Sequence, residues 1–566
     1  MKKNILFILP FTLLLLCSLA ACQGEIVSSV ETNAASEAAS LPTASATVLP
    51  SSTPLPTETA TPLPSPTFTP PTRLWIDPAL PQPFQQVPLP DGFVQASRPD
   101  QADLKLVVSD TEPMSHWIFT LVAPFPTIPN GITSPELRQT WQGVSPASFS
   151  GLPLLLSENT FQVLSAWWGA PALNAVKVLP EDQLLEYAWS NRPAWAIVPF
   201  ENLEPRWKVL EIDGFSPLRK DFAPENDALS VPISLLGQPA FTDAADQLAA
   251  LYPASNRDPG KLTTLILTGV TAMVRGTALT MEQRGVTYPG QDIGPWLREA
   301  DILHISNEIP FYDQCPFPEL YPAELRFCSN PAYIGLLEDM GTDIVELSGD
   351  HFGDYGPEAM AQTLKIYKDR GWPYYGGGAN LAEGRQPLLL EHNGNRLAIL
   401  GCNAKGVSFY APAGEDKPGA AACDFDLLQK DIADLKEQGY LVIVTFQDEE
   451  YYSYKAQPKL ITDFHTVAEA GADIVSGSQA HQPHGMEFLN STFVHYGLGN
   501  LFFDQFRFFP GPELDNAFID RHIFYNGKYI GTELLPIHFV DLARSRPMTP
   551  AEQAKFLKTI FTASGW

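Results

Sequence analysis

Basic residues are scarce in this chain of 566 residues. It holds 36 Lys and Arg residues against 64 Asp and Glu residues, which gives a formal net charge of -28 at pH 7. Such a surface repels nucleic acid and other anionic polymers at long range, so we expect no nucleic-acid partner. The simpler interpretation, that the acids only keep an extracellular protein soluble, is preferred unless they converge on a cation site.

Long apolar runs are also lacking, apart from one near the first residue. Lys2 and Lys3 precede an apolar run from Ile5 to Leu19, which is shorter than the roughly 20 residues that a bilayer span needs. This pattern predicts a secretory signal over residues 1–22. The sequence LAAC that ends at Cys22 resembles the bacterial lipobox, in which the Cys thiol is acylated; the alternative is an ordinary cleaved signal. We therefore expect an extracytoplasmic protein that Cys22 anchors to the membrane through lipid.

Aromatic and basic residues are nearly missing from residues 23–72. The segment from Ser28 to Thr72 is almost entirely Ser, Thr, Pro, Ala, Leu and Val, with no aromatic residue before Phe68. Such a segment cannot bury enough surface to offset its ordering entropy, and its prolines favour extended conformations. We predict a disordered tether over residues 23–72, which could extend on the order of 100 Å at about 3 Å per residue.

Cysteine is rare, and its positions support the same compartment. Cys17 leaves with the predicted signal, Cys22 is the predicted lipidation site, and four cysteines remain. Their grouping in two close pairs predicts the disulfides Cys315–Cys328 and Cys402–Cys423, because an oxidising exterior disfavours free thiols. Free buried thiols are the alternative, and the sequence alone leaves three pairings open.

About 490 residues follow the tether, which is too long for one ordinary core, so two domains are expected. We place them at residues 73–258 and 261–540, followed by a C-terminal tail at 541–566. In the first, apolar runs such as Leu104 to Val108 alternate with helical patterns. One of these begins at Thr133 with a hydroxyl cap, a Pro and a Glu. This alternation predicts an α/β lobe.

The first lobe resembles the type-2 periplasmic solute-binding proteins in three short stretches. They are Thr133 to Gly143, Leu154 to Ser157 and Trp195 to Phe200. A binding cleft would place polar groups on the loops at residues 126–133 and 157–160. Plain turns explain the same residues equally well.

The second region alternates five apolar strand patterns with helical segments. The strands are predicted at Leu262–Thr268, Asp301–Ile305, Asp343–Leu347, Leu441–Phe446 and Asp473–Val475. Polar residues follow them directly: Asn307, Glu308, Asp350, His351, Asp354, Gln447 to Glu450, Gln479, His481 and His484. Because α/β sheets bind ligands at the carboxyl ends of their strands, we predict one site that several of these loops build together.

The same residues carry a family resemblance. The stretch from Gly341 to His351, continuing into Asp354-Tyr355-Gly356, is similar to the CapA proteins of capsule and poly-γ-glutamate synthesis. Further stretches agree at Tyr375 to Gly378, at Ala472 to His481 and at Tyr496 to Gln505. The resemblance implies a calcineurin-like metallophosphoesterase fold, a β-sandwich flanked by helices, with one or two divalent metals at the strand ends.

The chain departs from the family pattern at several ligand positions. The family's first Asp is Val270, which cannot bind a metal, and the Asn before the family's His is Asp350. Gln447 and Gln479 stand where the family has His. The family's Asn-Leu-Glu is matched only by Glu308.

The remaining candidates predict a mononuclear site. Glu308, Asp350, His351 and His481 are the predicted ligands of one divalent ion, Mn, Zn or Mg, with Asp350 and His351 at the chemical centre. Supporting roles are predicted for His304, Asn307, Asp354, Gln447, Gln479 and His484. The alternative is a hydrogen-bonded loop network without metal. The acidic run at residues 448–450 is interpreted as a solvated turn in preference to a general base.

Two functions of different class follow from these residues. The first is a surface hydrolase or transferase of the metallophosphoesterase type, acting on an exopolymer or its anchor. The second is a binding or assembly protein that kept the fold and lost the catalytic metal, with a solute held by the first lobe. Both place the protein with a cell-surface polymer or its synthesis machinery.

Overall fold

The structure is a computed structural model that describes residues 70–144, 146–149, 151–505 and 514–566. The predicted signal, Cys22 and the tether up to residue 69 lie outside the described residues. Within those described ranges, no helix has both the length and the apolar character needed to cross a membrane.

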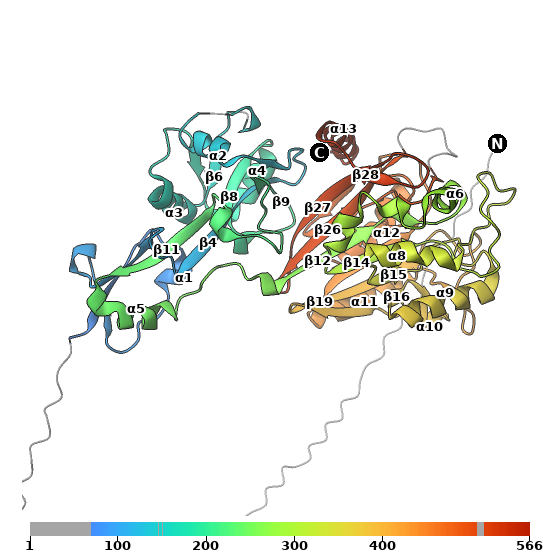
Figure 1. Cartoon of the computed structure of the whole chain (residues 1–566), viewed down its shortest axis with the longest axis horizontal. Coiled ribbons are helices and arrows are strands. Elements are labelled where there is room, and N and C mark those ends of the chain that lie inside the picture. The colour runs from blue at the N-terminus through green and yellow to red at the C-terminus, as the bar shows by residue number, and fades with distance from the viewer. Residues whose placement is uncertain (1–69, 145, 150, 506–513) are drawn as a thin grey trace, which may run out of the picture. The chain divides into compact units, whose positions relative to one another are not determined.

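The first lobe is built on a sheet of nine strands with helices packed against it (Figure 1). The strand order is β2 (Phe93–Gln95), β1 (Thr72–Ile76), β3 (Leu104–Val108), β11 (Ser230–Gly237), β4 (Ser115–Pro124), β8 (Trp195–Pro199), β6 (Leu154–Leu156) and β7 (Val176–Val178), and β9 (Trp207–Val209) pairs with β4. Its longer helices are α2 (Ser134–Trp141), α3 (Glu158–Trp168), α4 (Leu184–Ser190) and α5 (Thr242–Ala249). The predicted α/β lobe is confirmed.

Helix starts in this lobe follow from local chemistry. The Thr133 side chain accepts a hydrogen bond from the Glu136 N–H, and the Glu136 carboxylate accepts one from the Thr133 N–H at 2.8 Å, which forms a capping box. The Ser157 hydroxyl accepts from the Thr160 N–H at 3.3 Å and begins α3. The hydroxyl groups of the predicted cleft loop at residues 157–160 thus serve a helix cap.

The second region contains two facing sheets. The larger has the order β16 (Tyr374–Tyr375), β15 (Ile344–Glu346), β14 (Ile302–Asn307), β12 (Leu262–Thr268), β26 (Asn516–Tyr525), β27 (Lys528–Phe539) and β28 (Ser545–Pro547). In addition, β13 (Val270–Thr271) pairs with β14, and β25 (Asn500–Phe502) pairs with β13. The smaller has the order β18 (Leu388–His392), β19 (Asn395–Asn403), β21 (Leu441–Gln447), β22 (Ile474–Ser476), β24 (Thr492–His495) and β23 (Met486–Leu489).

Alternating side chains explain why each sheet is buried on both faces. On β21, Ile443 belongs to the core between the sheets, whereas Val444 belongs to the core under the outer helices. On β12, Leu265 points between the sheets and Ile266 points to the opposite layer. A strand that is buried at every position indicates a sheet covered on both faces, and the run from Leu262 to Thr268 is such a strand, as predicted.

Helices cover the outer faces of the sandwich. Those packed on the larger sheet are α6 (Arg275–Arg284), α7 (Gly294–Arg298), α8 (Ile334–Met340) and α9 (Gly356–Arg370). Those packed on the smaller sheet are α11 (Phe425–Glu437) and α12 (Pro458–Glu469). Figure 1 shows α8 and α9 lying beside β14, β15 and β16. This is the β-sandwich flanked by helices that the CapA resemblance implies, and the fold prediction is confirmed.

The segment 541–566, set apart above as a C-terminal tail, is folded. It forms β28, which pairs with β27, and α13 (Pro550–Ala563). Phe556 of α13 stacks on Phe518 of β26 with 4.8 Å between ring centroids. Its apolar residues recur at helical spacing and bury against the sandwich core.

Both predicted disulfides are present. Cys315 pairs with Cys328, and Cys402 pairs with Cys423. The second joins the end of β19 to the loop before α11, close to the strand ends where the candidate site lies. The structure thereby selects one of the three pairings that the sequence left open.

Candidate metal site at the strand ends

The predicted ligands lie on the loops that follow three strands. Glu308 follows β14, and Asp350 and His351 follow β15, its parallel neighbour. His481 follows β22 in the smaller sheet. A Cβ atom added to Gly349 would lie 2.6 Å from the Glu308 Cα, so only glycine lets the two loops approach this closely.

Glu308, Asp350 and His351 converge on one point. Each offers one ligand atom, and these atoms all lie within 4.8 Å of one another. Two carboxylates and an imidazole form a donor set that suits a divalent cation. The structure therefore brings together three of the four predicted ligands.

The carboxylate oxygens of this group lack the donors that buried anions need. Glu308 is completely buried, and among the described residues neither of its carboxylate oxygens has a hydrogen-bond partner. Oδ1 of Asp350 is buried and unpartnered in the same way. Burial raises the pKa of Glu308 well above its ordinary value, and the charges of Asp350 and Glu450 raise it further. A buried carboxylate without donors is costly, so the residues present fit a bound cation.

His351 is held in a fixed orientation. Its Nδ1 lies 2.7 Å from Oδ2 of Asp354, and that carboxylate also accepts a hydrogen bond from the Phe327 N–H at 2.8 Å. Burial lowers the pKa of His351, but Asp354, Glu308 and Asp350 outweigh this effect and raise it to about 9. A carboxylate on one ring nitrogen, with the other nitrogen left for a ligand, is the usual arrangement of metal-binding histidines.

His481 lies next to this group. Its Nε2 is 3.7 Å from Oε1 of Glu308 and 3.9 Å from Oε2 of Glu450. Its Nδ1 lies 2.9 Å from the Asn500 side-chain oxygen, and burial lowers its pKa. A neutral, buried imidazole beside Glu308 is suited to serve as a fourth ligand.

Four of the predicted supporting residues, Asn307, Gln447, Gln479 and His484, differ in their hydrogen bonds. Gln447 is fully buried, and neither its amide nitrogen nor its amide oxygen has a partner among the described residues. Gln479 donates to the Ser306 hydroxyl at 2.6 Å, and Asn307 donates to the Ile309 carbonyl at 2.6 Å. His484 has its Nδ1 2.5 Å from the Ser453 carbonyl, and burial lowers its pKa to about 4.

His304 serves a different buried carboxylate. Its Nε2 lies 3.2 Å from Oε2 of Glu346, and its Nδ1 accepts from the Thr268 N–H at 3.3 Å. The Glu346 carboxylate also accepts hydrogen bonds from the hydroxyls of Ser348, Thr445 and Ser478. Both ring nitrogens of His304 are therefore engaged away from Glu308.

The sequence analysis missed Lys405 and assigned Glu450 to the wrong environment. Lys405 follows β19, and its Nζ lies 2.5 Å from Oδ2 of Asp350 and 2.5 Å from Oε1 of Glu450. Within the acidic run Glu449 is exposed, as a solvated turn predicts, but Asp448 is buried beside Lys459, and Glu450 faces Lys405 and His481. Lys405 comes directly after a strand, so the rule applied to the other strands could have found it.

Arg275 is a second cation that the sequence analysis missed. It begins α6 with a positive φ of 47°, and its guanidinium contacts the Asp504 carboxylate at 3.3 Å. It also lies over the rings of Phe327 and Phe503, which pack against His351 and His481 respectively. These two phenylalanines form an apolar wall beside both imidazoles.

Val270 lies in a small apolar cluster where the family has an acid. The cluster holds Val270, Ala272, Val274, Ile309, Phe327 and Phe503, all buried. Its side chain therefore packs with hydrocarbon and offers no ligand at this position.

Comparison with known proteins supports the resemblance in this region. Residues 264–505 match the family model described as "Bacterial capsule synthesis protein PGA_cap". The "Capsule biosynthesis protein CapA" of Bacillus anthracis is 25% identical over 308 residues, covering 53% of this chain and 73% of that protein. The "PGA biosynthesis protein CapA" of Bacillus subtilis (strain 168) is 25% identical over 281 residues, covering 49% of this chain and 71% of that protein. The resemblance to the CapA proteins is confirmed.

Solved structures add little to this result. The NAD nucleotidase (NadN) of Haemophilus influenzae is 11% identical with a TM-score of 0.29, covering 53% of this chain and 56% of that chain. A TM-score this low does not establish a shared fold. The resemblance of the first lobe to solute-binding proteins, and the boundary between residues 258 and 261, stay predictions.

Proposed function

Starting from the PGA_cap match over residues 264–505, we propose that this chain is a surface lipoprotein of the CapA type that acts in capsule or exopolymer synthesis or anchoring. It would act there as a metal-dependent hydrolase or transferase. The proposed anchor is lipid on Cys22. The proposed partners are a cell-surface polymer or the machinery that makes it.

The observation that carries this proposal is the unpartnered Glu308 carboxylate beside Asp350 and His351. Three ligand atoms within 4.8 Å of one another, with a fully buried anion among them, support a site for one divalent ion such as Mn, Zn or Mg. When bound, such an ion acidifies a water molecule and polarises a phosphoryl oxygen. Glu308, Asp350 and His351 would hold it, with His481 as the fourth ligand.

Residues of the chain itself orient His351 and shield one side of both imidazoles from water. Asp354 holds Nδ1 of His351, so that the other ring nitrogen faces the ligand group. Phe327 and Phe503 cover one side of both imidazoles, which excludes water there and strengthens the local electrostatics. Asp350 and His351 are the residues proposed to lie at the reacting centre.

A second candidate function is a non-catalytic binding or assembly protein with a degenerate metal site. The apolar surroundings of Val270 favour it, since this position adds no anion. Gln447 and Gln479 favour it as well, because neutral amides bind metals less strongly than imidazoles do. The first lobe would then hold a solute.

Metal content and activity separate the two functions. The full chain would be purified in detergent, stripped with chelator and supplied with Mn²⁺ or Zn²⁺, and its metal content and its activity on a chromogenic phosphodiester would be measured. We expect a bound ion and hydrolysis in the wild type, and loss of both in Asp350→Asn. The matched control Asp339→Asn changes an acid on α8 that pairs with Arg298 at the surface, and it should behave as wild type. A wild type that holds no metal would leave the binding function standing.

A further inference from the structure

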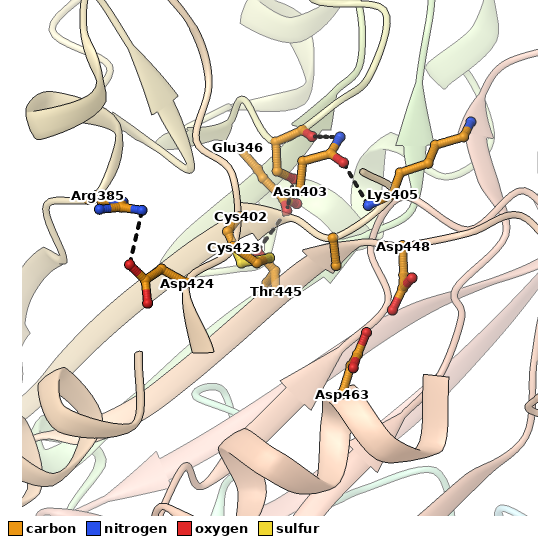
Figure 2. Close-up of a disulfide and its surroundings, with 12 residues drawn as sticks. Glu346, Arg385, Cys402, Asn403, Lys405, Cys423, Asp424, Thr445, Asp448 and Asp463 are labelled. Atoms are coloured by element: carbon orange, nitrogen blue, oxygen red, sulfur yellow. Dashed lines mark hydrogen bonds and ion pairs between the residues drawn. A yellow bond between two sulfur atoms is a disulfide. The ribbon is translucent and has the colours of Figure 1, made fainter. Parts of the chain in front are cut away.

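Lys405 is fixed in place by the end of β19. The Asn403 side-chain oxygen accepts from the Lys405 N–H at 2.9 Å, and the Asn403 amide donates to the Ser348 carbonyl at 2.8 Å. Ser348 lies two residues before Asp350, so Asn403 ties the Lys405 backbone to the loop that carries this ligand. Figure 2 shows the Cys402–Cys423 disulfide beside Asn403, with Lys405 extending from the end of the same strand.

The Lys405 ammonium bridges two carboxylates. It contacts Asp350 and Glu450 at 2.5 Å each, and the three side chains are 19%, 5% and 22% exposed. Asp350 also supplies a ligand atom to the Glu308 group, and its other oxygen, Oδ1, is buried without a partner among the described residues. Asp350 therefore contacts a fixed positive charge with Oδ2 and has Oδ1 left for the proposed metal.

This arrangement matches what a bridging carboxylate does between two cations. In a dinuclear site, each oxygen of such a carboxylate faces a different ion. Here an ammonium occupies one of the two cation positions, and Glu450 completes its anionic surroundings. A lysine ammonium is a compact point charge, so it can replace a cation electrostatically while binding no water for chemistry.

We propose that the Lys405 ammonium stands in the place of a second metal ion, so that the site holds one divalent ion. This inference rests on the proposed function, since it presumes a metal at Glu308, Asp350 and His351. A second cation in contact with both Asp350 and Glu450 would be repelled by the ammonium, which already contacts one oxygen of each carboxylate. Val270 removes a further anion from the same region.

The test counts bound ions. Full-length wild type, Lys405→Met and Lys459→Met would be stripped of metal, saturated with Mn²⁺ and measured by elemental analysis and electron paramagnetic resonance. Lys459 is the matched control, because it too bridges two carboxylates, Asp448 and Asp463, outside the Glu308 group. We expect one ion with the spectrum of isolated Mn²⁺ in the wild type and in Lys459→Met, and two spin-coupled ions in Lys405→Met.

The outcomes distinguish this inference from the proposed function. One ion in the wild type and no gain in Lys405→Met would overturn the role of Lys405 and leave the metal site standing. An equal gain in Lys459→Met would also overturn it, because any acid pair that loses its bridging lysine would then bind Mn²⁺. No ion in the wild type but one in Lys405→Met would overturn the proposed function. The gained ion would still support the inference that the Lys405 ammonium occupies a cation position. No ion in either protein would overturn both.

A measurement on the wild type guards against a variant that does not fold. Saturating Mn²⁺ should give only the isolated-ion spectrum in the unaltered protein. A spin-coupled pair in the wild type would show that a second metal ion binds despite Lys405. That result overturns the inference without any substitution.

Discussion

Glu308→Gln should stabilise the metal-free protein and abolish its stabilisation by metal. The substitution keeps the size and shape of the side chain and removes one charge. In the metal-free wild type, Glu308 is completely buried, no donor among the described residues reaches it, and burial raises its pKa. Its charge is therefore a cost to folding unless a cation is bound.

The sign and size of the effect follow from proton linkage. Because the folded carboxyl keeps its proton to a higher pH than the unfolded one, the free energy of unfolding falls as the pH rises above the ordinary Glu value. The loss is about 1.4 kcal/mol for each pH unit, which reaches at most about 3.5 kcal/mol at pH 7. The neutral amide that Glu308→Gln introduces cannot titrate, so the variant escapes this loss. At roughly 2 to 4 °C for each kcal/mol, its melting temperature should rise by a few degrees.

Bound metal should reverse the order of the two melting temperatures, so that the wild type melts above Glu308→Gln. Ligand at 100 times its dissociation constant stabilises a protein by about 2.7 kcal/mol, and the variant lacks the anion needed for tight binding. Calorimetric melting of the full chain in chelator and in Mn²⁺ would measure both states. Asp350→Asn is the contrasting variant: it should also lose the metal effect, but it should destabilise the metal-free protein because Lys405 loses a partner. A metal-free Glu308→Gln protein that melts below wild type would refute the reasoning.

Three further predictions concern the anchor, a disulfide and a buried imidazole. Cys22→Ser should move the protein from the membrane to the soluble fraction, and retention of the variant on salt-washed membranes would contradict a lipid anchor. Cys402→Ser and Cys423→Ser should each cost roughly 2 to 4 kcal/mol in denaturant unfolding, and the double variant should be no worse; additive losses would argue against the disulfide. Burial lowers the pKa of His522 to about 4, so the unfolded chain takes up a proton first as the pH falls from 6.5 towards 4, and stability should fall with it. His522→Gln should flatten this pH dependence by up to about 3 kcal/mol in unfolding experiments at several pH values, and an unchanged profile would count against a neutral buried His522.

The strands and helices could be predicted because each pattern depends on residues that are close together in the sequence. The run from Leu262 to Thr268 holds only Leu, Ile and Thr, it was predicted as a buried strand, and it forms β12 with those bounds. The capping residues at Thr133 and Glu136 predicted the start of α2, since they satisfy backbone groups within one turn. The fold class follows from such elements and their alternation. Residues 541–566 were set apart as a tail, although the apolar spacing of α13 could have identified a packed helix.

The residues of the candidate site could be predicted from the sequence only in part. Glu308, Asp350 and His351 follow successive parallel strands, so the rule for carboxyl ends placed them together. The same rule admitted His304, which the fold directs to Glu346, because a strand residue faces one side of its sheet or the other. The pattern of acids at residues 448–450 suggested solvent exposure, since sequence alone does not show what covers a loop.

The sequence by itself determined the α/β alternation, the predicted export signal and tether, the CapA resemblance and the residues available as ligands, because these depend on composition and short-range order. Only the tertiary structure decided which cysteines pair, which carboxylates are left without donors and where Lys405 lies. Lys405 is 55 residues from Asp350 and 45 from Glu450 along the chain. The contact with Asp350 joins the two sheets, and the contact with Glu450 joins the loops after the neighbouring strands β19 and β21. No local pattern in the chain encodes these distances.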